Sequence, residues 1–420
     1  MRVRNRLHLF LLAAALVFLA VGSASAEAPR NVILLIGDGM GFEQVKAAAL
    51  YATGKPGGLA LEPYYRGEVT THSSNSHQTG DHATDSAAAA TALATGHKTT
   101  NGRLSVTPDG RPLQTVLEVL RDRGKWTGLV TTVPITHATP AGFAAHNDNR
   151  GDYERIAADY FERSRPNVLF GAYWADGRGV TEAKALAAGY AVVRTRDELA
   201  DFVQANGAKK TPGVFSAQHP SGPSGKRHLE SFSPPPYLSG QFAAGQLPNE
   251  FDDANRQGEP SVTYDTVPHL AEMTRAALEI LARGPDGFFL MVEGGAIDWA
   301  CHANHLERTV GETLAFARAF QVALDWAEGR QDTLILVTAD HETGGLRVVQ
   351  PKDAGEYPDV FWASKGHSGA NVPLYALGPG AERFDGIVDN TDLFSVMAGE
   401  DPPAPQPEIA VTAEEAAVAP

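Results

Sequence analysis

Five short segments of this 420-residue chain are continuously apolar and rich in β-branched side chains. Apolar residues at successive positions, rather than at alternate ones, predict strands that are buried on both faces, as in a parallel sheet. This pattern constrains the fold more than any other feature of the chain. The predicted strands are Asn31–Ile36, Gly128–Val133, Gly287–Val292, Thr333–Thr338 and Val372–Leu377.

Segments with helical periodicity lie between these strands. Their apolar residues recur every three or four positions, in Ser86–Thr95, Leu113–Arg123, Thr266–Arg283 and Leu306–Ala327. The alternation predicts an α/β fold with a doubly wound, mostly parallel central sheet flanked by helices on both faces. Because 43% of the residues are hydrophobic and only 20% are charged, the chain has enough apolar material for a large core.

Two segments do not fit the strand and helix pattern. Residues from about 205 to 260 are rich in Pro, Gly and Ser, so we predict a surface insertion or cap there rather than sheet. Residues 401–420 are rich in Ala, Pro and Glu, and they predict a disordered tail because they cannot bury enough apolar surface.

The N-terminus has the pattern of a signal peptide. Three arginines precede the apolar run Leu7–Val21, and Ala24-Ser25-Ala26 follows it as a cleavage site. A membrane anchor is the alternative, but a run of about 15 residues is short for a span, which needs roughly 20. We therefore expect residues 1–26 to be removed, leaving no membrane span, and the protein to be exported, either periplasmic or secreted.

Net charge and cysteine content bear on two further properties, nucleic-acid binding and disulfide bonding. Removal of residues 1–26 would change the formal net charge from −15 to −18, so nucleic acid is not expected as a specific partner. Cys301 is the only cysteine, so the fold forms no internal disulfide. We expect Cys301 to be a packed, inert thiol.

Acidic and histidine residues follow several predicted strands directly. Asp38, Glu293 and the pair Asp340-His341 each stand at a strand's carboxyl end, where α/β sheets bind ligands. Carboxylates gathered at one edge repel each other unless cations neutralise them, so the pattern predicts a metal cluster. Asp298 and His302, four residues apart, share one helix face and suit zinc, although alone such a pair is more often an ordinary surface pair.

Ser86 begins the Ala-rich helical segment, where free N–H groups and the helix dipole favour a bound phosphate. A serine at this place is also a common helix N-cap, which is the favoured interpretation of Ser86 from local sequence alone.

Seven motifs in order resemble those of the alkaline phosphatase family and span most of residues 30–395. The resemblance implies a catalytic domain over residues 27–400 that hydrolyses small phosphate monoesters through a phosphoserine at Ser86. It also suggests, by analogy, a homodimer. The motifs are Gly37-Asp-Gly-Met-Gly41, Thr84-Asp-Ser-Ala-Ala88, Gly96-His-Lys-Thr-Thr-Asn-Gly102, His137-Ala-Thr-Pro140, Met291-Val-Glu-Gly-Gly-Ala-Ile-Asp298, Thr338-Ala-Asp-His341 and Gly366-His-Ser-Gly369.

The resemblance further implies two zinc ions and one magnesium ion. One zinc would be held by Asp298, His302 and His367, and the second by Asp38, Asp340 and His341. The magnesium would be held by Asp38, Thr139 and Glu293. Arg150 falls at the family's phosphate-binding arginine, with Asp85 orienting it.

His137 departs from one branch of the family, which has an aspartate ligand of magnesium at this position. Imidazole is a poor magnesium ligand, so we expect His137 to act through water or to weaken the third site. The competing functions are a phosphodiesterase or nucleotide pyrophosphatase on the same scaffold, and an exported phosphate- or metal-binding protein without activity.

Overall fold

The computed structural model describes residues 28–206, 237–255 and 263–400. The predicted signal peptide, the predicted tail and most of the predicted insertion lie outside these ranges. In the described part, no helix is both long and apolar enough to cross a bilayer.

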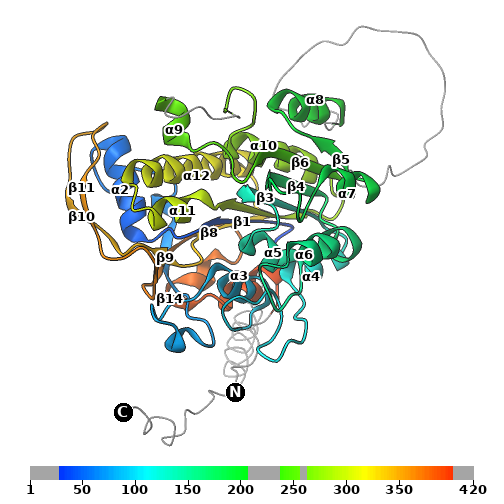
Figure 1. Cartoon of the computed structure of the whole chain (residues 1–420), viewed down its shortest axis with the longest axis horizontal. Helices are drawn as coiled ribbons and strands as arrows, with labels where there is room; N and C mark the ends of the chain where they lie inside the picture. Colours follow the sequence, from blue (N-terminus) through cyan, green and yellow to red (C-terminus); the bar gives the residue numbers. More distant parts are fainter. Residues whose placement is uncertain (1–27, 207–236, 256–262, 401–420) are drawn as a thin grey trace, which may run out of the picture.

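A central sheet of ten strands runs through the described part of the molecule (Figure 1). Only β13 runs antiparallel to its neighbours, so the sheet is mostly parallel, as predicted. The strand order is β14 (Gly386–Asp389), β2 (Tyr65–Thr70), β13 (Val372–Leu377), β8 (Thr333–Thr338), β1 (Asn31–Gly37), β7 (Phe288–Gly294), β3 (Trp126–Pro134), β4 (Val168–Tyr173), β6 (Leu238–Ala244) and β5 (Ala191–Val193).

Helices cover both faces of this sheet, which confirms the doubly wound prediction. One face packs against α10 (Leu270–Leu281) and α12 (Leu306–Ala327), with α2 (Phe42–Thr53) beside α12. The other face packs against α4 (Val116–Asp122) and α5 (Ala138–Ala144), with α3 (Ser86–Thr95) beside α5. The remaining helices are α6 (Tyr153–Asp159), α7 (Glu182–Ala187), α8 (Arg196–Asn206), α9 (Glu250–Asn255), α11 (Ala296–His302) and α13 (Asp392–Ala398).

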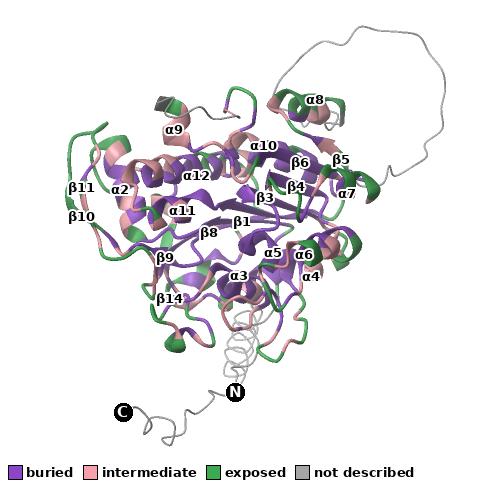
Figure 2. Ribbon diagram, in the orientation of Figure 1, coloured by how far each residue is buried: buried purple, intermediate pink, exposed green. Residues whose placement is uncertain are grey.

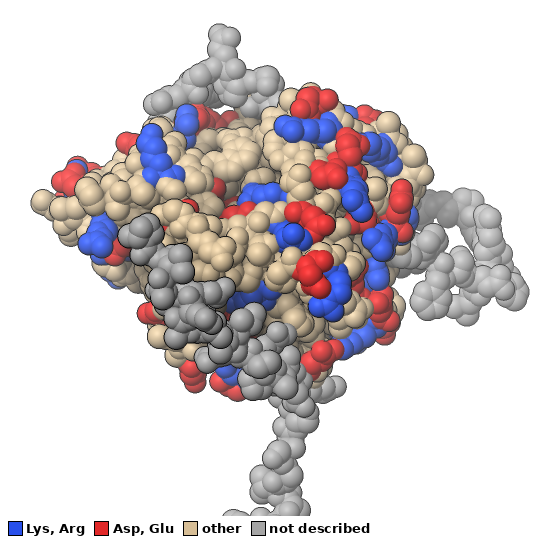
Figure 3. Space-filling model, turned by 60° about the horizontal axis from the view of Figure 1, so that its bottom comes forward, with Lys and Arg blue, Asp and Glu red and all other residues tan. Residues whose placement is uncertain are grey.

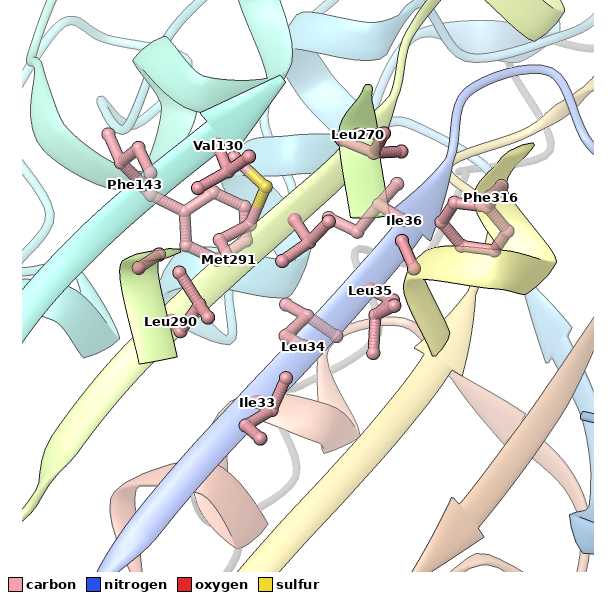
Figure 4. Packing of buried hydrophobic residues seen from close by; sticks show 14 of the residues in the cluster. Ile33, Leu34, Leu35, Ile36, Val130, Phe143, Leu270, Leu290, Met291 and Phe316 are labelled. Atoms are coloured by element: carbon pink, nitrogen blue, oxygen red, sulfur yellow. The ribbon is translucent and has the colours of Figure 1, made fainter. Parts of the chain in front are cut away.

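The core is formed on both faces of the central strands. Ile33 to Ile36 of β1 are fully buried, and alternate side chains point to opposite helical layers (Figure 4). Phe143 of α5 and Phe316 of α12 belong to these layers. Figure 2 shows the central strands as buried, whereas α7 and the hairpin of β10 (Leu346–Gln350) and β11 (Asp359–Trp362) expose much of their surface. Each aliphatic side chain buried here contributes roughly 1.5–3 kcal/mol.

The prediction for residues 205–260 is wrong in part, because β6 (Leu238–Ala244) lies inside this segment and forms part of the sheet. Its sequence contains Ser239, Gly240 and Gln241, so it lacks the apolar run that marks the other strands. Buried Gln241 donates a hydrogen bond of 3.3 Å to Ser239, which pairs these polar groups. The short or polar strands β2, β5 and β14 were also not predicted, and neither was β4, although its sequence is apolar and mostly buried.

Short strands after β8 carry the chain around the carboxyl edge of the sheet. β9 (Glu342–Thr343) pairs with β12 (His367–Ser368). Between them, β10 (Leu346–Gln350) and β11 (Asp359–Trp362) form a hairpin beside α2. This arrangement returns residues after β11 to the end of β8.

Candidate active site

The register of the parallel strands brings separated acidic residues to one level of the sheet. β1 lies between β7 and β8, with Ile36 opposite Glu293 on one side and Thr338 on the other. Asp38 and Asp340 each follow this level by two residues. The predicted gathering of carboxylates at the carboxyl edge is therefore present in the structure.

Asp38, Asp340 and His341 form one group that could hold a cation. All three are fully buried, and His341 Nε2 lies 3.6 Å from Asp38 Oδ1 and 3.2 Å from Asp340 Oδ2. Burial raises the pKa of Asp38 well above its usual value, and the Asp340 charge raises it further. Burial likewise raises the pKa of Asp340 to about 6. Two carboxylates in a dry site require positive charge to remain ionised.

Asp38 also belongs to a second group, with His137 and Glu293. Thr131 donates a hydrogen bond to Glu293, whereas burial raises the Glu293 pKa to about 7. Several buried atoms around this group have no hydrogen bond of normal geometry. Burying such polar atoms costs folding free energy unless another partner binds them. They are Asp38 Oδ1 and Oδ2, Asp340 Oδ2, Glu293 Oε1, His137 Nδ1 and Thr139 Oγ1. The donor set therefore fits divalent cations.

A third group consists of Asp298, His341 and His367. Asp298 Oδ1 lies 3.7 Å from His367 Nε2, and the rings of His341 and His367 stack with centroids 3.6 Å apart. His302 is outside this compact group but adjacent to it. Its Nε2 lies 3.3 Å from Asp298 Oδ2, and its ring centroid lies 5.1 Å from that of His367. The four residues bring three imidazoles around one carboxylate.

The residues of this third group shift one another's pKa values. Burial alone would raise the pKa of Asp298, but hydrogen bonding to His302 and the charges of nearby histidines lower it below its usual value. The hydrogen bond with Asp298 raises the pKa of His302 to about 9. Burial lowers the pKa of His341 well below its usual value, so this ring is neutral and able to bind a metal.

Sequence reasoning missed Thr343, a buried residue of β9 that joins two of these groups. Its hydroxyl donates a hydrogen bond of 2.6 Å to Asp298 Oδ1, and it lies 3.3 Å from His341 Nδ1. Its neighbour Glu342 binds the side chains of Gln44 and Ser368, and so ties β9 to α2 and β12. Only the proximity of Thr343 to His341 in sequence could have signalled this role.

Ser86 lies at the first position of α3, and its neighbour Asp85 is the N-cap. The Asp85 carboxylate accepts a hydrogen bond of 3.0 Å from Ala88 N–H, so the interpretation of Ser86 as the cap is wrong. Asp85, with ψ 167°, has the extended backbone geometry of an N-cap, so the helix begins at Ser86. The Ser86 hydroxyl is buried and lies 3.2 Å from His341 Nε2. It is therefore next to the Asp38, Asp340 and His341 group.

Arg150 is linked to the residue before Ser86, because it binds the side chain of Asp85. Its Nη1 donates a hydrogen bond of 2.9 Å to Asp85 Oδ2, and its Nη2 lies 3.3 Å from His137 Nε2. Burial would raise the pKa of Asp85, but the Arg150 charge lowers it below its usual value. Burial and Arg150 together lower the pKa of His137 to about 3, so His137 is neutral.

Cys301 and His305 lie outside the three groups and have structural roles. Cys301 is fully buried, which confirms the prediction that it is packed, and burial raises the pKa of its thiol. His305 accepts a hydrogen bond at the N-terminus of α12. On the face shown in Figure 3, Lys and Arg are interspersed with Asp and Glu.

Comparisons with known proteins agree with this geometry. A family model described as Alkaline phosphatase matches residues 29–168 and 224–357. The streptomycin-6-phosphate phosphatase of Streptomyces griseus is 37% identical, covering 89% of this chain and 91% of that protein. A cold-active alkaline phosphatase from Shewanella sp. has a similar structure, with a TM-score of 0.70, 27% identity, and coverage of 88% of this chain and 98% of that chain.

A third relative is a variant with a bound metal ion. This solved structure is a variant of TAB5 alkaline phosphatase in which a histidine is replaced by aspartate, with magnesium bound in its M3 site. The TM-score is 0.67 at 28% identity, and the match covers 88% of this chain and 97% of that chain.

Proposed function

The chain belongs to the alkaline phosphatase family and is a phosphate monoester hydrolase, and we propose that it works through a phosphoserine intermediate on Ser86. The observation that carries this proposal is that Asp85, not Ser86, caps α3. The Ser86 hydroxyl is consequently available at the N-terminus of a helix, beside the carboxylate and histidine groups. A binding protein without activity has no need of such a nucleophile, whereas a phosphatase that works through a covalent intermediate requires one.

We assign three cation sites to the clustered residues. One zinc would be held by Asp298, His302 and His367, and the second by Asp38, Asp340 and His341. Magnesium would be held by Asp38, Thr139 and Glu293, with His137 beside it. When bound, these cations would supply positive charge for the attacking and leaving oxygens of a phosphoryl transfer.

The chain's own residues then divide the remaining work. The Ser86 oxygen loses its proton to solvent and attacks phosphorus as the bond to the ester oxygen breaks in line with it. The departing alkoxide takes up a proton from solvent and leaves as the alcohol on the opposite side. The Arg150 guanidinium donates two hydrogen bonds to the non-bridging phosphate oxygens, where charge is concentrated in the transition state. Asp85 holds that guanidinium through Oδ2 and holds the start of α3 through Oδ1, so it aligns the nucleophile with the anion site. Hydrolysis of the phosphoserine by water releases inorganic phosphate.

His137 is proposed to reach the third cation through water. Its Nδ1 is buried without a hydrogen-bond partner, and it lies in one group with Asp38 and Glu293. In the TAB5 variant, magnesium is bound in the M3 site when a histidine is replaced by aspartate, and we propose that His137 corresponds to that histidine. Aspartate supplies the oxygen ligand that magnesium prefers.

Small phosphate monoesters are the substrates that we propose, in line with the phosphorylated small molecule for which the Streptomyces griseus relative is named. Export to the periplasm or the medium follows if residues 1–26 act as a signal peptide. A homodimer remains a proposal by analogy with the family.

The test compares a generic aryl phosphate with the matching aryl diester, with and without zinc and magnesium. Monoester turnover that depends on metal, with little diester turnover, is expected, and preference for the diester would favour the phosphodiesterase alternative. Ser86→Ala should lose most of the rate and all phosphoserine trapped by acid quenching. A Ser86→Ala enzyme that keeps full activity would rule out the proposed nucleophile.

A further inference from the structure

The chain just before Ser86 is held by the side chain of Asn101. Asn101 Oδ1 accepts a hydrogen bond of 3.2 Å from the Asp85 N–H, and Asn101 Nδ2 donates one of 3.0 Å to the Ala83 carbonyl. The amide therefore pairs with the backbone as a neighbouring strand would. It fixes the extended residues from which α3 starts.

Asn101 is itself anchored, and the next residue continues the contact. The Asn101 N–H donates a hydrogen bond of 2.9 Å to Asn75 Oδ1. The Gly102 N–H donates one of 3.0 Å to Asp85 Oδ2, and the Gly102 carbonyl accepts one of 2.8 Å from the Arg150 N–H. Gly102 has a φ of +86°, which a glycine adopts without strain, so these two contacts suit this residue.

We propose that Asn101 is a positioning residue that aligns the nucleophile Ser86 with the phosphate-binding Arg150, an inference that rests on the proposed function. Asp85 is the point through which it acts. One Asp85 oxygen accepts the N–H of Ala88 in α3, and the other accepts both Gly102 N–H and Arg150 Nη1. Asn101 holds the backbone of this same residue.

The opposite side of the segment is held by a residue of the metal groups. His367 Nδ1 lies 2.9 Å from the Thr84 carbonyl, between the two backbone groups that Asn101 binds. Asn101 and His367 thus fix the segment that leads into Ser86 from two directions. Removing Asn101 would leave one of these contacts and would loosen the Asp85 carboxylate together with the helix start.

A positioning role predicts a different outcome from a purely structural one. If Asn101 only stabilises the fold, its loss lowers the melting temperature and leaves the phosphate site of the folded protein unchanged. If it positions Asp85, its loss weakens phosphate binding and slows turnover in protein that is still folded. Small misalignments of reacting groups cost about tenfold to a hundredfold in rate.

The experiment uses Asn101→Ala and Asn101→Asp in the full-length, metal-loaded enzyme. Asn101→Asp retains the acceptor for the Asp85 N–H but cannot donate to the Ala83 carbonyl. The matched control is Asn167→Ala, because buried Asn167 accepts a backbone hydrogen bond of 2.9 Å from Thr127 at the opposite end of the strands. Four quantities are measured: kcat, KM, the melting temperature, and inorganic phosphate affinity by calorimetry.

Both Asn101 variants should lower kcat about tenfold or more and weaken phosphate binding severalfold. Asn167→Ala should lower only the melting temperature. Wild-type kcat and phosphate affinity in folded Asn101→Ala would overturn the positioning role. A wild-type enzyme that hydrolyses no aryl phosphate would refute the proposed function instead, while phosphate affinity would still test Asn101.

Discussion

The Thr343 hydroxyl donates a hydrogen bond of 2.6 Å to Asp298 Oδ1 and lies 3.3 Å from His341 Nδ1. A hydroxyl has one proton, so after donating to Asp298 it can only accept from the His341 Nδ1–H. That tautomer leaves the Nε2 lone pair of His341 facing Asp38 and Asp340. Thr343 therefore prepares both a carboxylate and an imidazole for metal binding.

Thr343→Val should lower zinc affinity about tenfold to a hundredfold, because valine keeps the volume and loses the hydroxyl. Zinc affinity is measured by competition with a chromophoric chelator. Thr274→Val is the matched control, since buried Thr274 donates its hydroxyl to Leu270 O within α10. Equal zinc affinity in the Thr343 and Thr274 variants would contradict this role.

Metal removal should destabilise the protein more at higher pH. In the metal-free protein, burial raises the pKa of Asp340 to about 6 and that of Glu293 to about 7. Groups with raised folded-state pKa values favour folding when protonated, and this contribution is lost as pH rises through those values. The drop in melting temperature on chelation should therefore be larger at about pH 8 than at about pH 5.5. A pH-independent drop would be inconsistent with uncompensated buried carboxylates.

His137→Asp should strengthen magnesium binding at the third site. His137 is neutral, because burial lowers its pKa to about 3, and its Nδ1 has no hydrogen-bond partner. An aspartate there would add an oxygen ligand near Asp38 and Glu293. Magnesium titration of the zinc-loaded enzyme should give a lower dissociation constant in the variant. His137→Asn supplies the uncharged control, and an unchanged magnesium affinity in His137→Asp would refute a third site at this position.

Sequence patterns predicted the parts of the fold that depend on local chemistry. The five apolar runs became strands, and Ser86–Thr95 and Leu306–Ala327 became helices with the predicted bounds. The strand β6 escaped prediction because its buried Ser239 and Gln241 satisfy each other only after folding. Patterns based on hydrophobicity cannot detect a polar strand of this kind.

The residues that support the site depend on contacts between distant parts of the chain. Thr343 contacts Asp298, 45 residues away, and Asn101 contacts Asp85, 16 residues away. No spacing rule links such pairs, although Asn101 lies within the Gly96–Gly102 motif. The choice of Asp85 as the cap of α3 likewise depends on Arg150 and Gly102, which hold its carboxylate.

A partly buried ion pair outside the metal groups should make stability depend on pH. His146 Nδ1 lies 2.9 Å from the Ser105 carbonyl, and its Nε2 lies 3.1 Å from Glu118 Oε1. Both partners are acceptors, so both ring nitrogens must be protonated and the imidazole is charged. Burial alone would lower the pKa of His146, but the hydrogen bond with Glu118 raises it above its usual value.

The sign of the effect follows from these shifts. The raised His146 pKa stabilises the fold below about pH 6.5, the unfolded value, and this contribution is lost as pH rises through the folded value. Although burial would raise the pKa of Glu118, the bond with His146 lowers it, so its contribution is lost as pH falls through that value. Glu118→Gln should lower the free energy of unfolding by about 1 to 3 kcal/mol between these limits. Denaturant unfolding across pH, with His146→Gln completing a double-mutant cycle, measures this; additive losses in the two single variants would contradict the pairing.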